Sequence, residues 1–384
     1  MKILVNNSER ISVFASIGLV IALYLVWVFS VSAKPPFDDL QDWQMTDFSQ
    51  TIISFEDIVE GGPGKDGIQS IDEPKFVGIS EAEEWLGDRE PVVAFSHEGV
   101  SRAYPLQILM YHELVNDEVV GLPVSVTYCP LCNAAMVFSR RYENHVLEFG
   151  VSGKVYNSNM VMYDRNTESW WLQFTGEGIV GNYTGGLLEL LPSQLVSFNH
   201  FRQTYPEGKV LSKQTGFNLK YGVNPYANYD SRNLPIAWFF RKPFDDRLPA
   251  MHRVLGVALN EQAMAFPLTA LNKEALLQTE IANEPVIIIS KAGMASAVDN
   301  KFIKDSKDVL AAVAFSRKHN NQLLDFELVN NQIIDKQTKS TWNMFGQAEE
   351  GELKGVRLKQ LDRGVYFSFV WLDFYPQSSI YASE

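Results

Sequence analysis

An internal repetition constrains this chain more than any other feature, because two regions that repeat one another are expected to share one fold. The segment Arg102–Leu106 (RAYPL) recurs as Met264–Leu268 (MAFPL). Further along, five residues recur in the same order with the same spacing: Asp164, Thr167, Ser169, Trp171 and Phe174 match Asp335, Thr338, Ser340, Trp342 and Phe345. Chance seldom keeps such blocks in order, so the sequence predicts two copies of one unit.

The repetition also separates positions that serve the fold from positions that are free to serve a site. Residues present in both copies are expected to maintain the shared structure. The two thiols and the imidazole have no counterpart in the second copy, where Cys129, Cys132 and His112 align with Lys291, Met294 and Glu274. We therefore expect the second copy to be a structural partner and the first copy to carry the functional site.

The composition of short segments predicts the class of fold. Pro91–Phe95, Pro123–Tyr128 and Pro285–Ile289 are rich in β-branched and aromatic residues and are predicted to be strands. Aromatic residues make up 12% of the chain, which also favours β-structure. No long helical pattern occurs, so the predicted fold class is α+β, mostly β, with two related copies of one β-rich unit.

Two short helices and one hairpin complete the prediction. Ser80–Leu86 is predicted to be a helix with a capping box between its first residue and Glu83. Leu106–Leu114 is predicted to be a second short helix or turn. Ala135–Phe138 and Val146–Phe149 flank a polar turn and are predicted to pair as a hairpin.

The first residues predict a membrane segment. Ile11–Val31 carries no charge and is long enough to cross a bilayer, which takes about 20 helical residues. Lys2 and Arg10 precede it, so the positive-inside rule places the body outside the cytoplasm, on the periplasmic side of the cytoplasmic membrane. The small residues that end at Ala33 resemble a signal-peptidase site, so both a retained single-pass anchor and a removed signal peptide remain open.

The predicted organisation therefore has four parts. Residues 1–33 form the anchor or signal, and residues 34–75 form a tether and a glycine-rich loop. The first copy, with the cysteines, covers residues 76–245, and the second copy covers residues 246–384. A formal net charge of -13 disfavours nucleic acid as a partner, because a phosphate backbone is bound by lysine and arginine.

The concentrated chemistry of the chain is one dithiol, Cys129-Pro130-Leu131-Cys132, which contains both cysteines of the sequence. Two intervening residues bring the sulfurs within bonding reach in a turn. A structural disulfide is one interpretation, but so short a loop removes little entropy from the unfolded chain. Redox chemistry is the favoured interpretation, with Cys129 as nucleophilic thiolate, Cys132 as resolving thiol, and an unknown thiol or protein partner. It requires no cofactor.

Metal binding is the alternative interpretation of the same dithiol. Cys129 and Cys132 would need further ligands, for which His112 and Met136 are candidates. A set of thiolates, imidazole and thioether suits copper better than zinc. A ligand-binding or scaffold module with a structural disulfide is a third possibility.

Other residues are candidates for supporting roles around the dithiol. His112 and Glu113 are candidate bases or ligands, because both titrate and both lie just before the strand that leads to Cys129. Lys65 and Asp66 lie in the glycine-rich stretch Gly61–Gly67, which could line a pocket. Asn157 is a candidate for orienting a ligand.

The sequence resembles a bacterial exported-protein family called domain of unknown function 3179. The resemblance extends over nearly the whole exported body, and its most specific stretch is Val126–Cys132. Gly61–Ile68, Arg102–Leu106, Met162–Arg165 and Asn224–Tyr226 also carry it. The activity of that family is not established, so the resemblance implies a shared site around Cys129 and Cys132 rather than a reaction.

Overall fold

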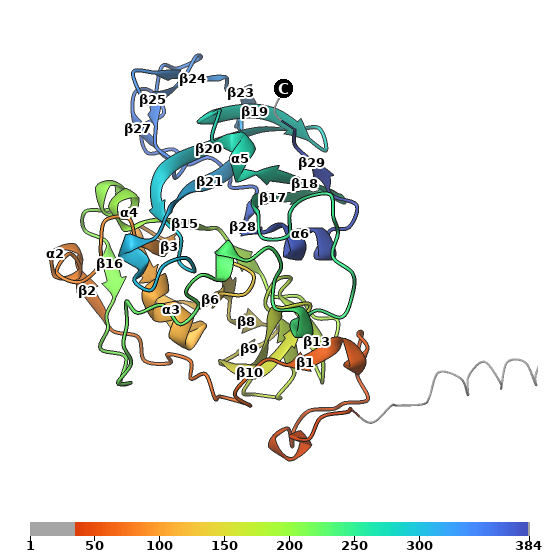
Figure 1. Ribbon diagram of the computed structural model, residues 1–384. Helices are drawn as coiled ribbons and strands as arrows, with labels where there is room; N and C mark the ends of the chain where they lie inside the picture. The colour runs from red at the N-terminus through yellow and green to blue at the C-terminus, as the bar shows by residue number, and fades with distance from the viewer. Residues whose placement is uncertain (1–34, 383–384) are drawn as a thin grey trace, which may run out of the picture.

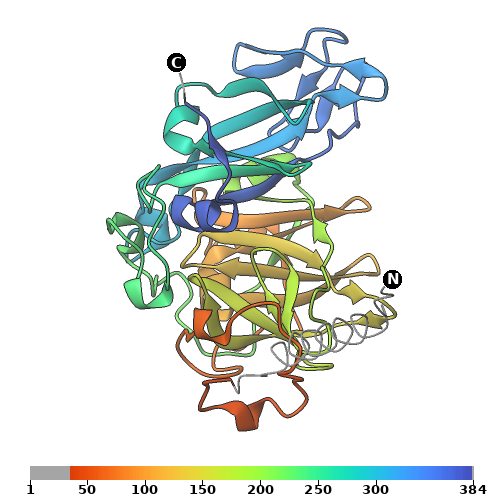
Figure 2. The ribbon, with the colours of Figure 1, turned by 90° about the vertical axis from the view of Figure 1, so that its right-hand side faces the viewer.

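The computed structural model describes residues 35–382, and the uncharged run Ile11–Val31 lies outside them. Within the described part, no helix is long and apolar enough to cross a membrane. The structure is mostly β, with several sheets and a few short helices, as the sequence predicts (Figure 1). Figures 1 and 2 both place the teal-to-blue second half of the chain above the orange-to-green first half.

The first half folds into separate antiparallel-rich sheets. One sheet has the order β15 (Ser193–Ser197), β3 (Pro91–His97), β4 (Val100–Pro105), β16 (Lys209–Leu211) and β2 (Phe76–Gly78). A second has the order β14 (Leu190–Leu191), β7 (Ala134–Ser139), β6 (Leu122–Cys129) and β5 (Leu114–Val119). A third has the order β1 (Ile58–Glu60), β10 (Phe149–Tyr156), β11 (Asn159–Asp164), β12 (Trp170–Leu172) and β13 (Glu177–Val180).

The second half contains sheets in a matching order. One has the order β28 (Asp362–Phe367), β17 (Arg253–Leu259), β18 (Gln262–Pro267) and β29 (Ser379–Ile380). The next has the order β19 (Leu276–Ile281), β20 (Glu284–Ala295) and β21 (Asp308–Ser316). The last has the order β24 (Phe326–Val329), β25 (Gln332–Asp335), β26 (Thr341–Trp342) and β27 (Ala348–Glu350). Small ribbons join the sheets: β8 (Arg141–Tyr142) with β9 (His145–Val146), and β22 (Lys318–His319) with β23 (Gln322–Leu323).

The α-helices are short, and four of the five occupy matching places in the two halves. They are α2 (Ile79–Ala82), α3 (Leu106–His112), α4 (Phe198–Thr204), α5 (Leu268–Leu271) and α6 (Ser368–Phe374). α3 follows β4 as α5 follows β18, and α4 follows β15 as α6 follows β28. The strand that follows the second of these helices then pairs in parallel in each half, β16 with β4 and β29 with β18.

The repeated residues make the same hydrogen bonds in both halves. Asp164 accepts from the indole Nε1 of Trp171 at 2.9 Å, and Asp335 accepts from that of Trp342 at 2.9 Å. Each aspartate also accepts from the backbone N–H of a threonine three residues on, at 2.7 Å and 2.6 Å. A buried carboxylate needs such donors, so the spacing of these residues serves the fold.

The two halves share their cores. The largest buried cluster combines first-half residues such as Trp171 with second-half residues such as Trp371. The aromatic contacts between the halves are reciprocal. Phe174 of the first half stacks on Phe374, the last residue of α6, and Tyr205, which follows α4, packs on Phe345 of the second half. The first-half helix α4 therefore packs against the sheets of the second half.

Two local predictions are wrong. The helix α2 begins after Gly78, which has no side chain to cap it, so the predicted capping box at Ser80 does not form. The predicted hairpin forms only at its tip, where β8 pairs with β9 across the polar turn. Ala135–Phe138 and Val146–Phe149 do not pair with each other, because β7 pairs with β6 and β14. The strand β10, which begins at Phe149, pairs with β1 and β11 instead. Pairing with these strands therefore replaces the local pairing that the turn residues predict.

Candidate functional site

The two cysteines lie at a tight turn between β6 and β7. Cys129 is the last residue of β6, and the N–H of Cys132 donates back to the carbonyl of Cys129 at 3.2 Å. Asn133 then adopts a left-handed conformation with φ 53°, which lets β7 begin at Ala134. Asparagine tolerates this conformation better than most residues, so the turn follows from the local sequence.

Both sulfurs are buried, free and directed at one backbone oxygen. Cys132 Sγ donates to the carbonyl of Ser158 at 3.1 Å, and Cys129 Sγ donates to the same oxygen at 3.7 Å. Ser158 stands in a two-residue turn between β10 and β11, where Asn157 and Ser158 both have positive φ, as a type I′ hairpin requires. The hairpin therefore aims a single acceptor at the dithiol.

The two thiols have different surroundings. Burial, a hydrogen bond with Cys129 and the charge of Cys129 raise the pKa of the Cys132 thiol well above its usual value. The amide Nδ2 of Asn159 donates to Cys132 Sγ at 3.6 Å and opposes this rise. Cys129, by contrast, lines a cavity of about 160 Å³, and Cys132 does not. Both cysteines are almost fully buried, and the upstream one is the one that borders the cavity.

Glu113 lines the same cavity as Cys129. It follows α3 in a left-handed conformation with φ 58°, and its N–H donates to the carbonyl of Leu109 at 2.6 Å. Burial raises the pKa of Glu113 to about 7, against the opposing effect of a hydrogen bond with Tyr226. A carboxyl group that exchanges its proton near neutral pH is suited to acid–base chemistry beside a thiol.

A segment between β16 and β17 forms part of the cavity wall. Tyr226, Ile236 and Phe239 line the cavity, and the Tyr229 hydroxyl donates to the carbonyl of Leu131, inside the dithiol turn, at 3.1 Å. The N–H of Ser158 donates to the carbonyl of Phe239 at 2.8 Å. We call residues 224–240 the covering segment, because these contacts place it against both the dithiol turn and its acceptor.

The covering segment is held to the second half of the chain by one buried carboxylate, that of Asp230. The carboxylate of Asp230 pairs with Arg253 at 3.0 Å and with Lys307 at 3.0 Å. Burial alone would raise the pKa of Asp230, but these cations and a hydrogen bond from Ser296 hold it below its usual value. The second half therefore positions a wall of the first-half cavity.

The structure does not bring His112 together with the two cysteines as a set of metal ligands. His112 Nδ1 lies 2.6 Å from the carbonyl of Gln69, and its Nε2 lies 2.6 Å from the Tyr221 hydroxyl. Met136 stands in β7 opposite Thr127 and is buried in the core. Across residues 35–382, no three His, Cys, Asp or Glu side chains gather in a way that could hold a metal ion, so the predicted ligand set does not assemble.

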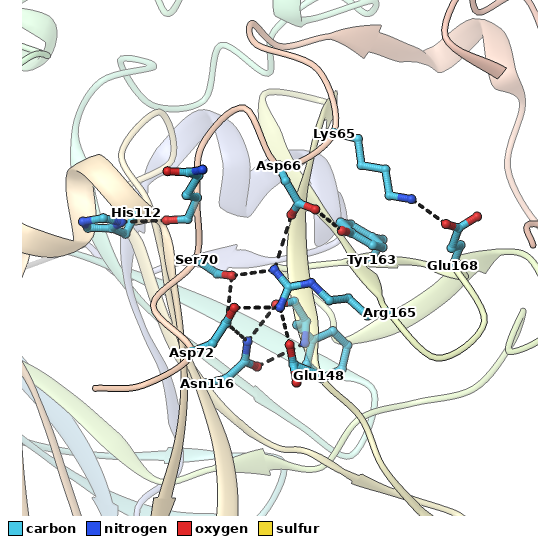
Figure 3. A network of polar contacts seen from close by, with 12 residues as sticks. Lys65, Asp66, Ser70, Asp72, His112, Asn116, Glu148, Tyr163, Arg165 and Glu168 are labelled. Atoms are coloured by element: carbon cyan, nitrogen blue, oxygen red, sulfur yellow. Dashed lines mark hydrogen bonds and ion pairs between the residues drawn. The ribbon is translucent and has the colours of Figure 1, made fainter. Parts of the chain in front are cut away.

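The predicted pocket residues Lys65, Asp66 and Asn157 do not line the cavity. Figure 3 shows Lys65 directed at Glu168, and Asp66 at Tyr163 and Arg165. Asn157 donates to Asp373 at 2.6 Å. The glycine-rich loop does reach the cavity, but through its first residues, Gly61, Gly62 and Pro63.

The cavity includes residues that the sequence did not indicate. Ile236 and Phe239 lie in an irregular segment without periodicity, and the Ser158 carbonyl is a backbone group that no side-chain pattern reveals. Tyr226 lies in the Asn224–Tyr226 motif, which is the one sequence signal that could have pointed to the covering segment.

Comparison with known proteins identifies the family. The model of the family described as "Protein of unknown function (DUF3179)" matches residues 65–378, so the chain belongs to that family. No curated protein and no solved structure matches it significantly. The family match covers the glycine-rich loop from Lys65, the dithiol, the covering segment and nearly all of the second half.

Proposed function

We propose that this family member carries out thiol–disulfide redox chemistry, with Cys129 as the attacking thiol and Cys132 as the resolving thiol. One observation carries the proposal: Cys129 shares its cavity with Glu113, a carboxyl group of pKa about 7, while both sulfurs converge on the Ser158 carbonyl. The convergence supports formation of a Cys129–Cys132 bond, and the carboxyl supplies a proton acceptor next to the sulfur that a substrate reaches.

The reaction balances as an exchange of two electrons. Cys129 gives its proton to Glu113, and the thiolate attacks one sulfur of a substrate disulfide. A mixed disulfide forms, and the departing substrate thiolate takes the proton from Glu113. Cys132 then attacks Cys129 Sγ, its proton passes to the second substrate thiolate, and the protein disulfide forms. The substrate disulfide is reduced and the protein dithiol is oxidised; the reverse sequence oxidises a substrate dithiol.

The high pKa of Cys132 fits a resolving role. A thiol that stays protonated until a mixed disulfide forms next to it does not compete with Cys129 for the substrate. The order of the two cysteines in the proposal therefore rests on their different surroundings as well as on the exposure of Cys129 to the cavity.

The size of the cavity favours a small partner. A volume of about 160 Å³ is less than the roughly 300 to 1,000 Å³ of typical ligand sites. Most of its lining side chains are apolar, with Met160, Leu131 and Phe239 among them. We therefore expect a disulfide or thiol of low mass as the partner, whereas a protein disulfide requires the covering segment to move.

Trapping of the mixed disulfide tests this proposal. Full-length Cys132→Ser protein, incubated with 2-hydroxyethyl disulfide, should accumulate a mixed disulfide on Cys129, detected by mass spectrometry. Cys129→Ser is the matched control and should accumulate far less. Equal modification of the two variants, or of neither under conditions where both are folded, would overturn the assignment.

Two measurements separate this proposal from the two other functions predicted from the sequence: elemental analysis of the wild-type protein, and a test of a double variant in cells. Stoichiometric copper or zinc bound through the thiols would favour a metal-binding protein. A double variant, Cys129→Ser with Cys132→Ser, that keeps full function in cells would favour a scaffold or ligand-binding module.

We also propose that the protein is held on the periplasmic side of the cytoplasmic membrane through Ile11–Val31. The uncharged run and the preceding Lys2 and Arg10 support this placement, and an oxidising compartment suits a reversible dithiol. The mass of the mature protein distinguishes a retained anchor from cleavage after Ala33. Protease added to cells with a permeabilised outer membrane should digest the body; protection would contradict this placement.

We propose, finally, that the two halves arose by duplication of one unit. The matching order of strands and helices supports this, as do the matching hydrogen bonds of Asp164 and Asp335. Under this proposal the dithiol is a feature that one of two equivalent units acquired or kept.

A further inference from the structure

A second and larger cavity lies between α4 and the sheets of the second half. Its volume is about 490 Å³, within the roughly 300 to 1,000 Å³ of small-molecule sites. His200, Gln203 and Thr204 line it from α4, and residues of β20, β25 and β26 line the other side. Of these elements, α4, β20 and β25 are labelled in the upper left part of Figure 1. We call this cavity the second-half cleft.

The second-half cleft occupies the position that corresponds to the dithiol cavity. Lys291 stands opposite Ala311 in the β20–β21 pair, as Cys129 stands opposite Ala134 in the β6–β7 pair. Lys291 lines the cleft, as Cys129 lines the dithiol cavity. Ala275 lines it just before β19, as Glu113 lines the dithiol cavity just before β5. No residue of the covering segment is among those that line the cleft, so it is wider and more open.

The chemistry of the second-half cleft differs from that of the dithiol cavity. Lys291 supplies a positive charge, and no described residue forms an ion pair with it. Seven further lining residues carry amide or hydroxyl groups and seven are apolar; the polar ones are Gln203, Thr204, Ser290, Asn331, Gln332, Thr341 and Asn343. The one carboxylate, Glu349, accepts a hydrogen bond from Asn343 at 3.1 Å. A free cation among neutral hydrogen-bonding groups is suited to a polar anion.

His200 is the second unsatisfied group at this site. Only 6% of the residue is exposed, and its Nδ1 has no hydrogen-bond partner. Buried polar groups are normally paired, so an unpaired imidazole that lines a cavity is a candidate hydrogen-bonding group for a ligand. Burial and the positive charge of Lys291 lower the pKa of His200 to about 4, and Asp308 opposes this. Near neutral pH the ring is therefore uncharged.

We propose that the second-half cleft binds a small organic anion, a carboxylate that carries further hydroxyl or amide groups. The carboxylate contacts Lys291, and the neutral groups of the ligand contact His200 and the surrounding amides. This site is independent of the dithiol chemistry, because the dithiol cavity and the cleft have no lining residue in common.

Calorimetric titration of the full-length protein with D-gluconate tests the proposal. D-glucitol is the matched probe, since it keeps the hydroxyl groups but has no carboxylate. Gluconate should bind with a Kd of millimolar order or tighter, which corresponds to about −4 kcal/mol or better. Glucitol should bind at least about tenfold more weakly.

Two variants locate the binding. Lys291→Gln removes the charge and should weaken gluconate at least about tenfold. Lys220→Gln removes an exposed lysine that does not line the cleft and should leave the affinity unchanged. The imidazole signals of His200, followed by NMR, should report a raised pKa when gluconate is present, because the anion offsets the charge of Lys291.

Several outcomes overturn the proposal. If neither gluconate nor citrate binds at about 10 mM, the second-half cleft is not a site for small organic anions. Equal affinity for glucitol would show that the carboxylate is not recognised. Unchanged affinity in Lys291→Gln, with the variant folded as judged by its thermal unfolding, would place the binding elsewhere.

Discussion

Replacement of Glu113 by glutamine is expected to stabilise the protein at alkaline pH. Burial raises the pKa of this carboxyl from 4.5 to about 7. Below pH 4.5 the group is neutral in both folded and unfolded states, so the substitution changes little. Between pH 4.5 and about 7 the unfolded state releases the proton while the folded state keeps it, and the wild type loses stability.

The magnitude follows from the difference in pKa. Each unit corresponds to about 1.4 kcal/mol, so the wild type should lose about 3 kcal/mol between the two pKa values. Glutamine cannot ionise and avoids this loss. Urea unfolding of full-length wild type and Glu113→Gln should therefore give similar free energies near pH 4.5 and a gap of about 3 kcal/mol above about pH 7.

Asp362 provides a matched control for the role of Glu113 in the chemistry. Burial raises its pKa to about 7 as well, but it lies on β28 and does not line the dithiol cavity. Asp362→Asn should reproduce the stability effect. Only Glu113→Gln should slow the alkylation of Cys129 and remove its inflection near pH 7. A free-energy gap that is the same at every pH, or equal alkylation rates in the two variants, would refute the reasoning.

Three further comparisons test the packing of the two halves and of the covering segment. Trp171→Phe and Trp342→Phe each remove a hydrogen bond to a buried aspartate. Each should lower the free energy of chemical unfolding by about 2 to 4 kcal/mol. A large loss in only one of the two variants would contradict equivalent roles for the two tryptophans. Gly256→Ala places a Cβ 2.1 Å from the Trp371 ring and should lower the unfolding free energy by about 1 to 3 kcal/mol, whereas Gly78→Ala meets nothing and should cost less; equal effects would exclude overpacking as the cause. Tyr229→Phe removes the bond to the Leu131 carbonyl, worth about 1 kcal/mol, and should speed alkylation of Cys129 about fivefold without changing the cavity lining; an unchanged rate would show that the covering segment does not limit access.

The sequence predicted strands well where their pairing is set by local composition. Pro123–Tyr128 was predicted and β6 covers Leu122–Cys129, because β-branched and aromatic residues fill a strand that is buried on both faces. The strand predicted at Pro285–Ile289 extends to Ala295, since a bulge near Lys291 lets β20 continue beside β21. Pairing with distant partners is decided by the whole fold, which is why the hairpin prediction failed.

The sequence predicts that the two cysteines lie together, but it does not predict which residues surround them. The spacing of Cys129 and Cys132 determines that they meet, yet nothing in the sequence distinguishes His112 from Glu113 as the neighbour of the dithiol. The left-handed conformation at Glu113 decides this, because it ends α3 and turns successive side chains in different directions. The covering segment has no periodicity, so its position depends on buried partners such as Arg253, which lies in the other half of the chain.

Thiol trapping in intact cells, followed by redox titration of the purified protein, tests the central claim most directly. We predict that Cys129 and Cys132 interconvert between dithiol and disulfide, with a reduction potential above the roughly −300 mV typical of structural bridges. A pair that stays in one state when cells are treated with reductant or oxidant, or a bond that common dithiol couples cannot reduce, would contradict redox chemistry at this site.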